Sequence, residues 1–209
     1  LNIVRGVEKP PVGADGKPVM PVYEYAWRRL TEANPFPSVM GRVCPAPCET
    51  GCNRNQVEDH VGINSVEHFL GEYAIQNKLK FAAPATKTGK KIAVIGGGPA
   101  GLSAAYQLAR MGHDVTIFDE HEFLGGMMRY GIPGFRTPRD VLDAEIQRIL
   151  DLGVQTRLKT RIGSDITMEE IRKQFDAVFL GLGAQGGRAL PCEGNDAPNV
   201  VTATSFLRA

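Results

Sequence analysis

The sequence predicts an α/β protein with a helical N-terminal domain followed by a doubly wound parallel sheet. Two observations support this: apolar residues recur at helical spacing up to Leu79, and short apolar runs alternate with helical patterns after Gly89. The segment AAPATKTG at 82–89 is rich in small and polar residues, as a linker would be. We therefore expect a helical domain at 1–81, a linker at 82–89 and an α/β domain at 90–209.

The N-terminal domain is expected to contain two amphipathic helices. The first covers Tyr23 to Ala33 and stops at the Pro-rich segment NPFP that follows it. The second covers Ile63 to Leu79 and is expected to bury one apolar stripe, which consists of Ile63, Val66, Leu70 and Ala74. Three of the four cysteines lie between these helices, in a segment expected to be a loop.

In the C-terminal domain, strands and helices are expected to alternate, which is typical of a parallel sheet with crossover helices. The expected strands are 91–95, 114–118, 154–158 and 177–182, and the expected helices are 99–111, 139–152 and 168–174.

Composition narrows the class of protein. The chain has 209 residues with 24 Lys and Arg against 23 Asp and Glu, so a polybasic surface for nucleic acid is not favoured. No apolar run approaches the ~18 residues that a membrane span needs, and the first residues do not show the charged, apolar and small-residue pattern of a signal peptide. We expect a cytoplasmic protein. The sequence begins at Leu1 instead of Met, so we expect it to be part of a longer protein.

A glycine-rich motif lies between the first expected strand of the C-terminal domain and its first helix. It consists of Gly96, Gly97, Gly98, Pro99, Ala100 and Gly101, which supplies the pattern G-x-G-x-x-G. In this position the first glycine makes the turn, the second lets a pyrophosphate approach, and the third allows close packing of helix and strand. Asp119 follows the second strand, about 20 residues on, where a carboxylate accepts ribose hydroxyls. The pattern predicts a Rossmann-like domain that binds an adenine dinucleotide.

The same fingerprint serves FAD and NAD(P), so a further observation is needed to choose between them. A second glycine-rich segment, LGGMMRYGIP at 124–133, directly follows the second strand and contains Gly125, Gly126 and Met127. Such a long excursion suits a ligand that extends past its pyrophosphate, as FAD does. A flexible connector is the alternative interpretation.

The cysteine segment has the spacing C-x3-C-x3-C at Cys44, Cys48 and Cys52. Thiolates this close together repel unless a cation neutralises them, which indicates an Fe-S cluster or zinc. His60 and His68 are candidate zinc ligands, although a solvated position is the more ordinary role for His68. Cys192 is expected to be a lone structural thiol.

Glu67 falls inside the expected buried stripe of the second helix. An unpaired carboxylate there would carry a desolvation cost of several kcal/mol. We therefore expect a positive group beside it, either an iron or an arginine such as Arg42 or Arg54.

Together these motifs resemble the family of the glutamate synthase small subunit. Its relatives include the flavin and Fe-S domains of dihydropyrimidine dehydrogenase, the large subunit of the bifurcating transhydrogenase and the flavoprotein partner of dissimilatory sulfite reductase. The resemblance covers about residues 20 to 207. The segments that carry it are NPFP at 34–37, GRVCPAPC at 41–48, 63–69, 96–101, 124–133 and the pair FR at 135–136.

The resemblance implies an Fe-S domain with two [4Fe-4S] clusters, then an FAD domain with an NAD(P) domain inserted. It implies that Cys44, Cys48 and Glu67 are ligands of one cluster and Cys52 of the other. It also implies FAD contacts by Gly96 to Ala100, Asp119, Gly125 to Met127, Arg136 and Ile162. The family's upstream cysteines have no counterpart before Cys44, and the second, NAD(P)H-binding fingerprint is not reached by Ala209.

The function implied is an NAD(P)H-dependent oxidoreductase that passes electrons through FAD and Fe-S clusters. The implied partner is a glutamate synthase large subunit, a ferredoxin or a sulfur-cycle reductase, in an oligomer or complex. Two alternatives remain. One is a docking module with a structural Fe-S or zinc site and no NAD(P)H activity, and the other is a plain NAD-binding dehydrogenase.

Overall fold

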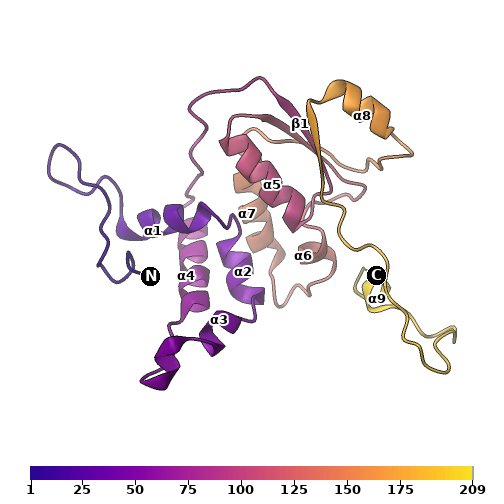
Figure 1. The fold of residues 1–209 in the computed structure, drawn as a ribbon, viewed down its shortest axis with the longest axis horizontal. Helices are drawn as coiled ribbons and strands as arrows, with labels where there is room; N and C mark the ends of the chain where they lie inside the picture. The colour runs from indigo at the N-terminus through magenta and orange to yellow at the C-terminus, as the bar shows by residue number, and fades with distance from the viewer. Residues whose placement is uncertain (209) are drawn as a thin grey trace. The chain divides into compact units, whose positions relative to one another are not determined.

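The computed structural model describes residues 1–208 and divides into two compact units (Figure 1). Unit 1 comprises Leu1–Phe81 together with Asp143–Arg148. Unit 2 comprises Ala82–Leu142 and the described residues from Ile149 onward.

Unit 1 is helical. Its elements are α1 (Val22–Thr31), α2 (Pro37–Val43), α3 (Pro47–Thr50), the 3-10 helix η1 (Asn53–Gln56) and α4 (Ile63–Gln76). The expected cysteine loop therefore contains α3 and η1, each four residues long, and follows directly from α2. Proline begins both α2 and α3 because its missing N–H costs nothing in the first turn of a helix.

Helices α2 and α4 lie side by side in unit 1 (Figure 1). Two glycines allow their close approach. A Cβ at Gly71 would overlap the backbone of Ser38, and one at Gly41 would lie 2.5 Å from Cβ of His68. The sequence thus brings the helix that precedes Cys44 against the helix that carries Glu67.

The core of unit 1 surrounds Trp27, which is fully buried. Its ring stacks on Phe81 with centroids 5.3 Å apart, and the guanidinium of Arg148 lies 5.1 Å from the Trp27 ring. Arg148 also donates from Nε to the carbonyl of Leu79 at 2.9 Å. These contacts fix the end of the segment that follows α4.

The predicted stripe of α4 is buried only in part. Leu70 and Ala74 belong to the core, whereas Ile63 is 48% exposed. The first turn of α4 meets polar groups instead: Asn64 donates from its backbone to Glu49 at 2.8 Å and from its side chain to the carbonyl of Cys44 at 3.1 Å. The prediction that Ile63 is buried was wrong because the cysteine segment offers this turn hydrogen bonds and few apolar side chains.

Unit 2 contains the predicted parallel sheet. Its strands β1 (Lys91–Ile95), β2 (Asp114–Phe118), β3 (Gln155–Arg157) and β4 (Ala177–Leu180) follow the order β3-β2-β1-β4. All three pairings are parallel. The order changes direction between β1 and β4, and in open parallel sheets the carboxyl ends of strands at such a point form the ligand crevice.

The remaining elements of unit 2 are helical: α5 (Pro99–Arg110), α6 (Met127–Tyr130), α8 (Met168–Gln174) and α9 (Ala203–Arg208). A further helix, α7 (Arg139–Leu150), contributes Asp143–Arg148 to unit 1. Ala93, Phe118 and Ile171 form one buried cluster of the sheet. These side chains come from β1, β2 and α8, so their burial packs this helix against the sheet.

Among residues 1–208, no helix combines the length and the apolar character that crossing a membrane requires.

Candidate functional site

A cleft of about 380 Å³ opens in unit 2 where β1, β2 and β4 end. Its walls come from the turn after β1, the end of β2, helix α6, the segment after β3 and the segment after β4. This is the crevice expected from the strand order.

The glycines of the fingerprint shape the cleft through the space that they leave. Gly96 has φ +105°, and a Cβ there would overlap the carbonyl of Gly181. A Cβ at Gly101 would overlap the carbonyl oxygen of Gly96, so this glycine permits the contact of α5 with β1. At Gly98 the situation differs, because an added Cβ would have only Cα of Gly126 within 4 Å, at 3.7 Å. Gly98 therefore leaves open room at the cleft wall.

Helix α5 points its N-terminus at the cleft. Gly98 is its N-cap and Pro99 its first residue, and no side chain caps the helix. The first N–H groups of a helix carry partial positive charge and lack partners within the helix. A glycine-lined helix N-terminus of this kind fits the pyrophosphate of a dinucleotide.

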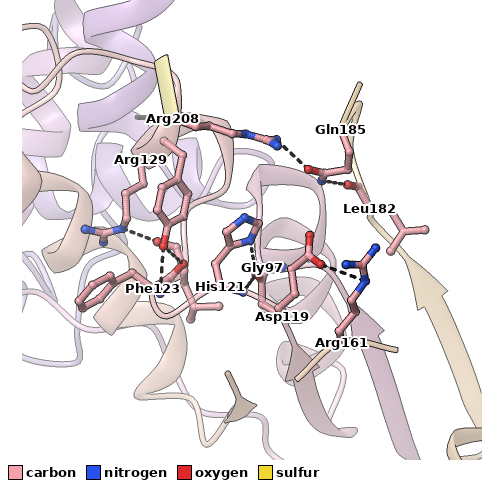
Figure 2. A network of polar contacts seen from close by, with 12 residues as sticks. Gly97, Asp119, His121, Phe123, Arg129, Arg161, Leu182, Gln185 and Arg208 are labelled. Carbon is pink, nitrogen blue, oxygen red and sulfur yellow. Dashed lines mark hydrogen bonds and ion pairs between the residues drawn. The ribbon is translucent and has the colours of Figure 1, made fainter. Parts of the chain in front are cut away.

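Asp119 lies at the end of β2, 9% exposed, and is held by three hydrogen bonds (Figure 2). Gly97 N–H donates to Oδ2 at 2.6 Å, His121 N–H donates to Oδ1 at 2.8 Å, and the His121 ring nitrogen Nδ1 lies 2.9 Å from Oδ1. The carboxylate is thus fixed at the edge of the cleft, beside the turn that would receive the pyrophosphate.

The structure brings most of the predicted nucleotide residues to one place. Those that line the cleft are Gly96, Gly98, Pro99, Ala100, Asp119, Gly126, Met127 and Ile162. Gly97 and Gly101 do not line the cleft. Gly97 donates a hydrogen bond to Asp119, and Gly101 lies in close contact with Gly96. Gly125 is buried against Arg129 and Leu142, and Arg136 is exposed outside the lining residues.

The lining also contains polar residues that the sequence patterns did not predict, among them His121, Tyr130 and Arg161. Arg161 pairs with Glu120 at 3.5 Å, and the rings of His121 and Tyr130 lie 4.8 Å apart. The position of His121, two residues after the expected ribose carboxylate, is the only sequence signal that could have pointed to it.

The predicted metal ligands lie in unit 1. Cys44 ends α2, Cys48 lies in α3 and Cys52 precedes η1; the first two are exposed and the third is partly exposed. Hydrogen bonds from the backbone N–H groups of Val61 and Arg54 lower the pKa of Cys52. The backbone nitrogen of Ala46 lies 3.4 Å from Sγ of Cys44. Cys192 is an exposed free thiol of unit 2.

Glu67 is half-buried, and Asn34 from the segment NPFP donates to its Oε1 at 2.7 Å. The predicted arginine alternatives were wrong for this structure. Arg42 pairs with Glu72 at 2.7 Å, and Arg54 pairs with Glu58. Arg42 also donates to the carbonyl of Ser38, one turn earlier in α2, at 3.0 Å, and this hydrogen bond holds its guanidinium beside Glu72.

Within residues 1–208, no three His, Cys, Asp or Glu side chains converge closely enough to hold a metal ion. His60 faces Glu49 at 3.3 Å, and His68 lies 3.9 Å from Glu72. Among the residues that the structure describes, the cysteine segment therefore does not assemble a complete metal site by itself.

Two models of known families match the chain. Residues 21–79 match dihydropyrimidine dehydrogenase domain II, 4Fe-4S cluster, and residues 94–161 match an NAD(P)-binding Rossmann-like domain. The first match contains the cysteine segment and Glu67, and the second contains the glycine fingerprint and Asp119.

Curated relatives match over most of the chain. The glutamate synthase [NADPH] small chain of Bacillus subtilis is 39% identical over 89% of this chain, and the NADPH-Fe(3+) oxidoreductase subunit beta of Geobacter sulfurreducens is 43% identical over 78%. The chain spans 39% of the length of the first relative and 25% of the second.

Among solved structures, FprA of Mycobacterium tuberculosis in complex with NADPH matches 57% of this chain and 28% of its own, with a TM-score of 0.52 and 21% identity. This likeness concerns the fold alone. The two domain matches and the curated relatives show that this chain is homologous to part of the glutamate synthase small chain and of related oxidoreductase subunits.

Proposed function

We propose that the protein is part of a cytoplasmic NAD(P)H-dependent oxidoreductase in which FAD and [4Fe-4S] clusters carry electrons to a partner reductase or synthase. The names of the relatives support this, because they describe NADPH-dependent enzymes and a small chain or subunit beta. The observation that carries the proposal is the cleft at the N-terminus of α5, in one chain with a segment that matches a 4Fe-4S domain.

The residues of the cleft fit the adenosine diphosphate part of FAD. Gly98 leaves the space that a pyrophosphate needs, α5 offers unpaired N–H groups, and Asp119 is fixed beside both. We assign Gly96 to Gly101, Asp119, Gly125 to Met127, Arg136 and Ile162 to FAD. When bound, a flavin accepts a pair of electrons and releases them one at a time. The role of the protein residues is to orient the cofactor and exclude water.

The choice of FAD over NAD(P) rests on α6. Met127 and Tyr130 of this helix line the cleft beyond the fingerprint, and Gly126 reaches it with φ +49°. The second glycine-rich segment therefore forms a wall for a ligand that continues past its pyrophosphate. A carboxylate at Asp119, instead of an arginine, also suits a ribose without a 2′-phosphate.

The nucleotide carried by the purified protein tests this assignment. Denaturing the protein and identifying the released nucleotide by mass spectrometry should yield FAD. Tightly bound NADP⁺ or NAD⁺ without flavin would instead support a plain nicotinamide dehydrogenase and overturn the proposal.

We also propose that Cys44, Cys48, Cys52 and Glu67 contribute ligands to the clusters. The match of residues 21–79 to a 4Fe-4S domain supports this, although these residues do not form a complete site by themselves. Replacing Glu67 with alanine should change the cluster content or its reduction potential, because a carboxylate is a harder ligand than a thiolate.

Anaerobic reconstitution followed by iron analysis and EPR measures this effect. Glu58→Ala is the matched control, because Glu58 is an exposed glutamate of the same unit that pairs with Arg54. Unchanged iron content, EPR signal and potential in Glu67→Ala would contradict the assignment of this ligand.

A further inference from the structure

The carboxylate of Asp119 is nearly saturated by the protein itself. An ionised carboxylate has about four acceptor positions, two on each oxygen. Oδ1 accepts from both the backbone N–H and the ring of His121, and Oδ2 accepts from Gly97 N–H. One acceptor position on Oδ2 is therefore left for a ligand. A ribose presents two neighbouring hydroxyls, so Asp119 alone serves only one of them.

His121 supplies a second acceptor at the same place. Because an ionised carboxylate only accepts hydrogen bonds, the proton on the His121 ring must sit on Nδ1, which lies 2.9 Å from Asp119. In the neutral imidazole the other nitrogen, Nε2, then carries a lone pair. His121 lines the cleft with its side chain 31% exposed, so the imidazole lies within reach of a ligand bound there.

The ring of His121 is also held in place. Tyr130 lies against it with a centroid distance of 4.8 Å, and the Tyr130 hydroxyl accepts from the backbone N–H of Phe123 at 3.1 Å. Arg129 donates to the carbonyl of Leu124 at 2.6 Å and steadies the same segment. Figure 2 shows Asp119, His121, Phe123 and Arg129 among the residues of this network of polar contacts.

We propose that His121 binds the adenosine ribose together with Asp119. Nε2 of His121 accepts a hydrogen bond from one ribose hydroxyl, and the remaining acceptor position on Oδ2 of Asp119 accepts a hydrogen bond from the other. This inference rests on the proposed function for the cleft and adds a second residue to ribose recognition. The chemical class recognised is an adenine nucleotide whose ribose carries both free hydroxyls.

The test uses ADP-ribose, which shares the adenosine diol with FAD, and measures its dissociation constant by calorimetry. His121→Leu removes the acceptor and should weaken binding about three- to tenfold, the effect of one hydrogen bond between neutral groups. His121→Asn should weaken binding equally, because it keeps an N–H group for Asp119 but lacks the distal acceptor. His113→Leu is the matched control, since His113 bonds Thr88 outside the cleft lining.

Analogues that lack one hydroxyl separate a direct contact from a structural role. One analogue lacks the hydroxyl that donates to His121, and wild type and His121→Leu should bind it with equal affinity. The other analogue keeps that hydroxyl, so wild type should still bind it more tightly than His121→Leu does. A difference that persists with both analogues, or unchanged ADP-ribose binding by both variants, would overturn the inference.

Failure of the inference can be distinguished from failure of the proposed function. If the wild type binds ADP-ribose but not FAD and His121→Leu weakens that binding, the flavin assignment fails and the role of His121 stands. If FAD binds and neither His121 variant differs from wild type in ADP-ribose binding, the flavin assignment stands and the role of His121 fails. A wild type that binds neither ligand overturns both.

Discussion

Replacing Glu145 with alanine is expected to destabilise unit 1 by about 3 kcal/mol. Glu145 is fully buried, and its two oxygens accept from the backbone N–H groups of Ser38 at 2.8 Å and Val39 at 2.9 Å. These N–H groups begin α2, whose own N-cap, Phe36, supplies no side-chain cap. Alanine would leave both donors buried without an acceptor. Because α2 runs directly into Cys44, the cysteine segment should also lose order.

Urea denaturation measures the loss of stability. Asp140→Ala is the matched control, since Asp140 is an exposed carboxylate of the same helix, α7. An unchanged urea midpoint in Glu145→Ala would show that other groups accept hydrogen bonds from the N–H groups at the start of α2.

Glu145 also predicts how stability depends on pH. Burial raises the pKa of its carboxyl from 4.5 to about 7, against the lowering effect of the Val39 and Ser38 hydrogen bonds. The folded state thus holds the proton more tightly than the unfolded chain. This contribution is fully present below about pH 4.5 and is lost as pH rises through 7. Glu145→Gln should remove this pH dependence, which is on the order of 3 kcal/mol.

Comparing urea midpoints of wild type and Glu145→Gln across this pH range isolates the effect, because all other groups are shared. Parallel curves for the two proteins would contradict the raised pKa.

Gly98 and Gly101 of the glycine fingerprint should respond in opposite ways to substitution by alanine. Gly98→Ala should fold normally, because its Cβ would have only Cα of Gly126 within 4 Å, at 3.7 Å, and its φ of −79° suits any residue. The new methyl group would nevertheless occupy the space that a pyrophosphate needs. We expect FAD affinity to fall by roughly tenfold or more, which corresponds to about 1.4 kcal/mol.

Gly101→Ala should damage the fold instead, since its Cβ would overlap the carbonyl oxygen of Gly96. Thermal unfolding and FAD titration of both variants distinguish the two effects. Gly134→Ala is the control, because a Cβ there meets nothing within 4 Å. Normal FAD binding by Gly98→Ala would place the pyrophosphate elsewhere.

Local patterns in the sequence were enough to predict the main elements. The spacing of Gly96, Gly98 and Gly101, and the apolar runs before and after them, predict strand, turn and helix because each feature spans only a few residues. The cleft follows from this, since parallel strands bring the turn after β1 and the end of β2 to one edge.

What the sequence could not predict depends on distant partners. Glu145 meets Ser38 across 107 positions of the chain, and Asn34 meets Glu67 across 33. No periodicity connects such residues. The short helices α2, α3, η1, α6 and α9 were missed because helices of four to seven residues carry too little pattern. Ile63 was wrongly expected to be buried because the first turn of its helix meets hydrogen-bonding groups.

The most direct test of the account is the combined optical and EPR spectrum of one anaerobic preparation, with iron and acid-labile sulfide measured in the same sample. The proposed oxidoreductase should show flavin absorbance together with iron, sulfide and an EPR signal from a [4Fe-4S] cluster after reduction. A protein that holds iron or zinc without flavin would be a structural docking module, and a protein with nucleotide but no metal would be a simple dehydrogenase. Either result would contradict the account.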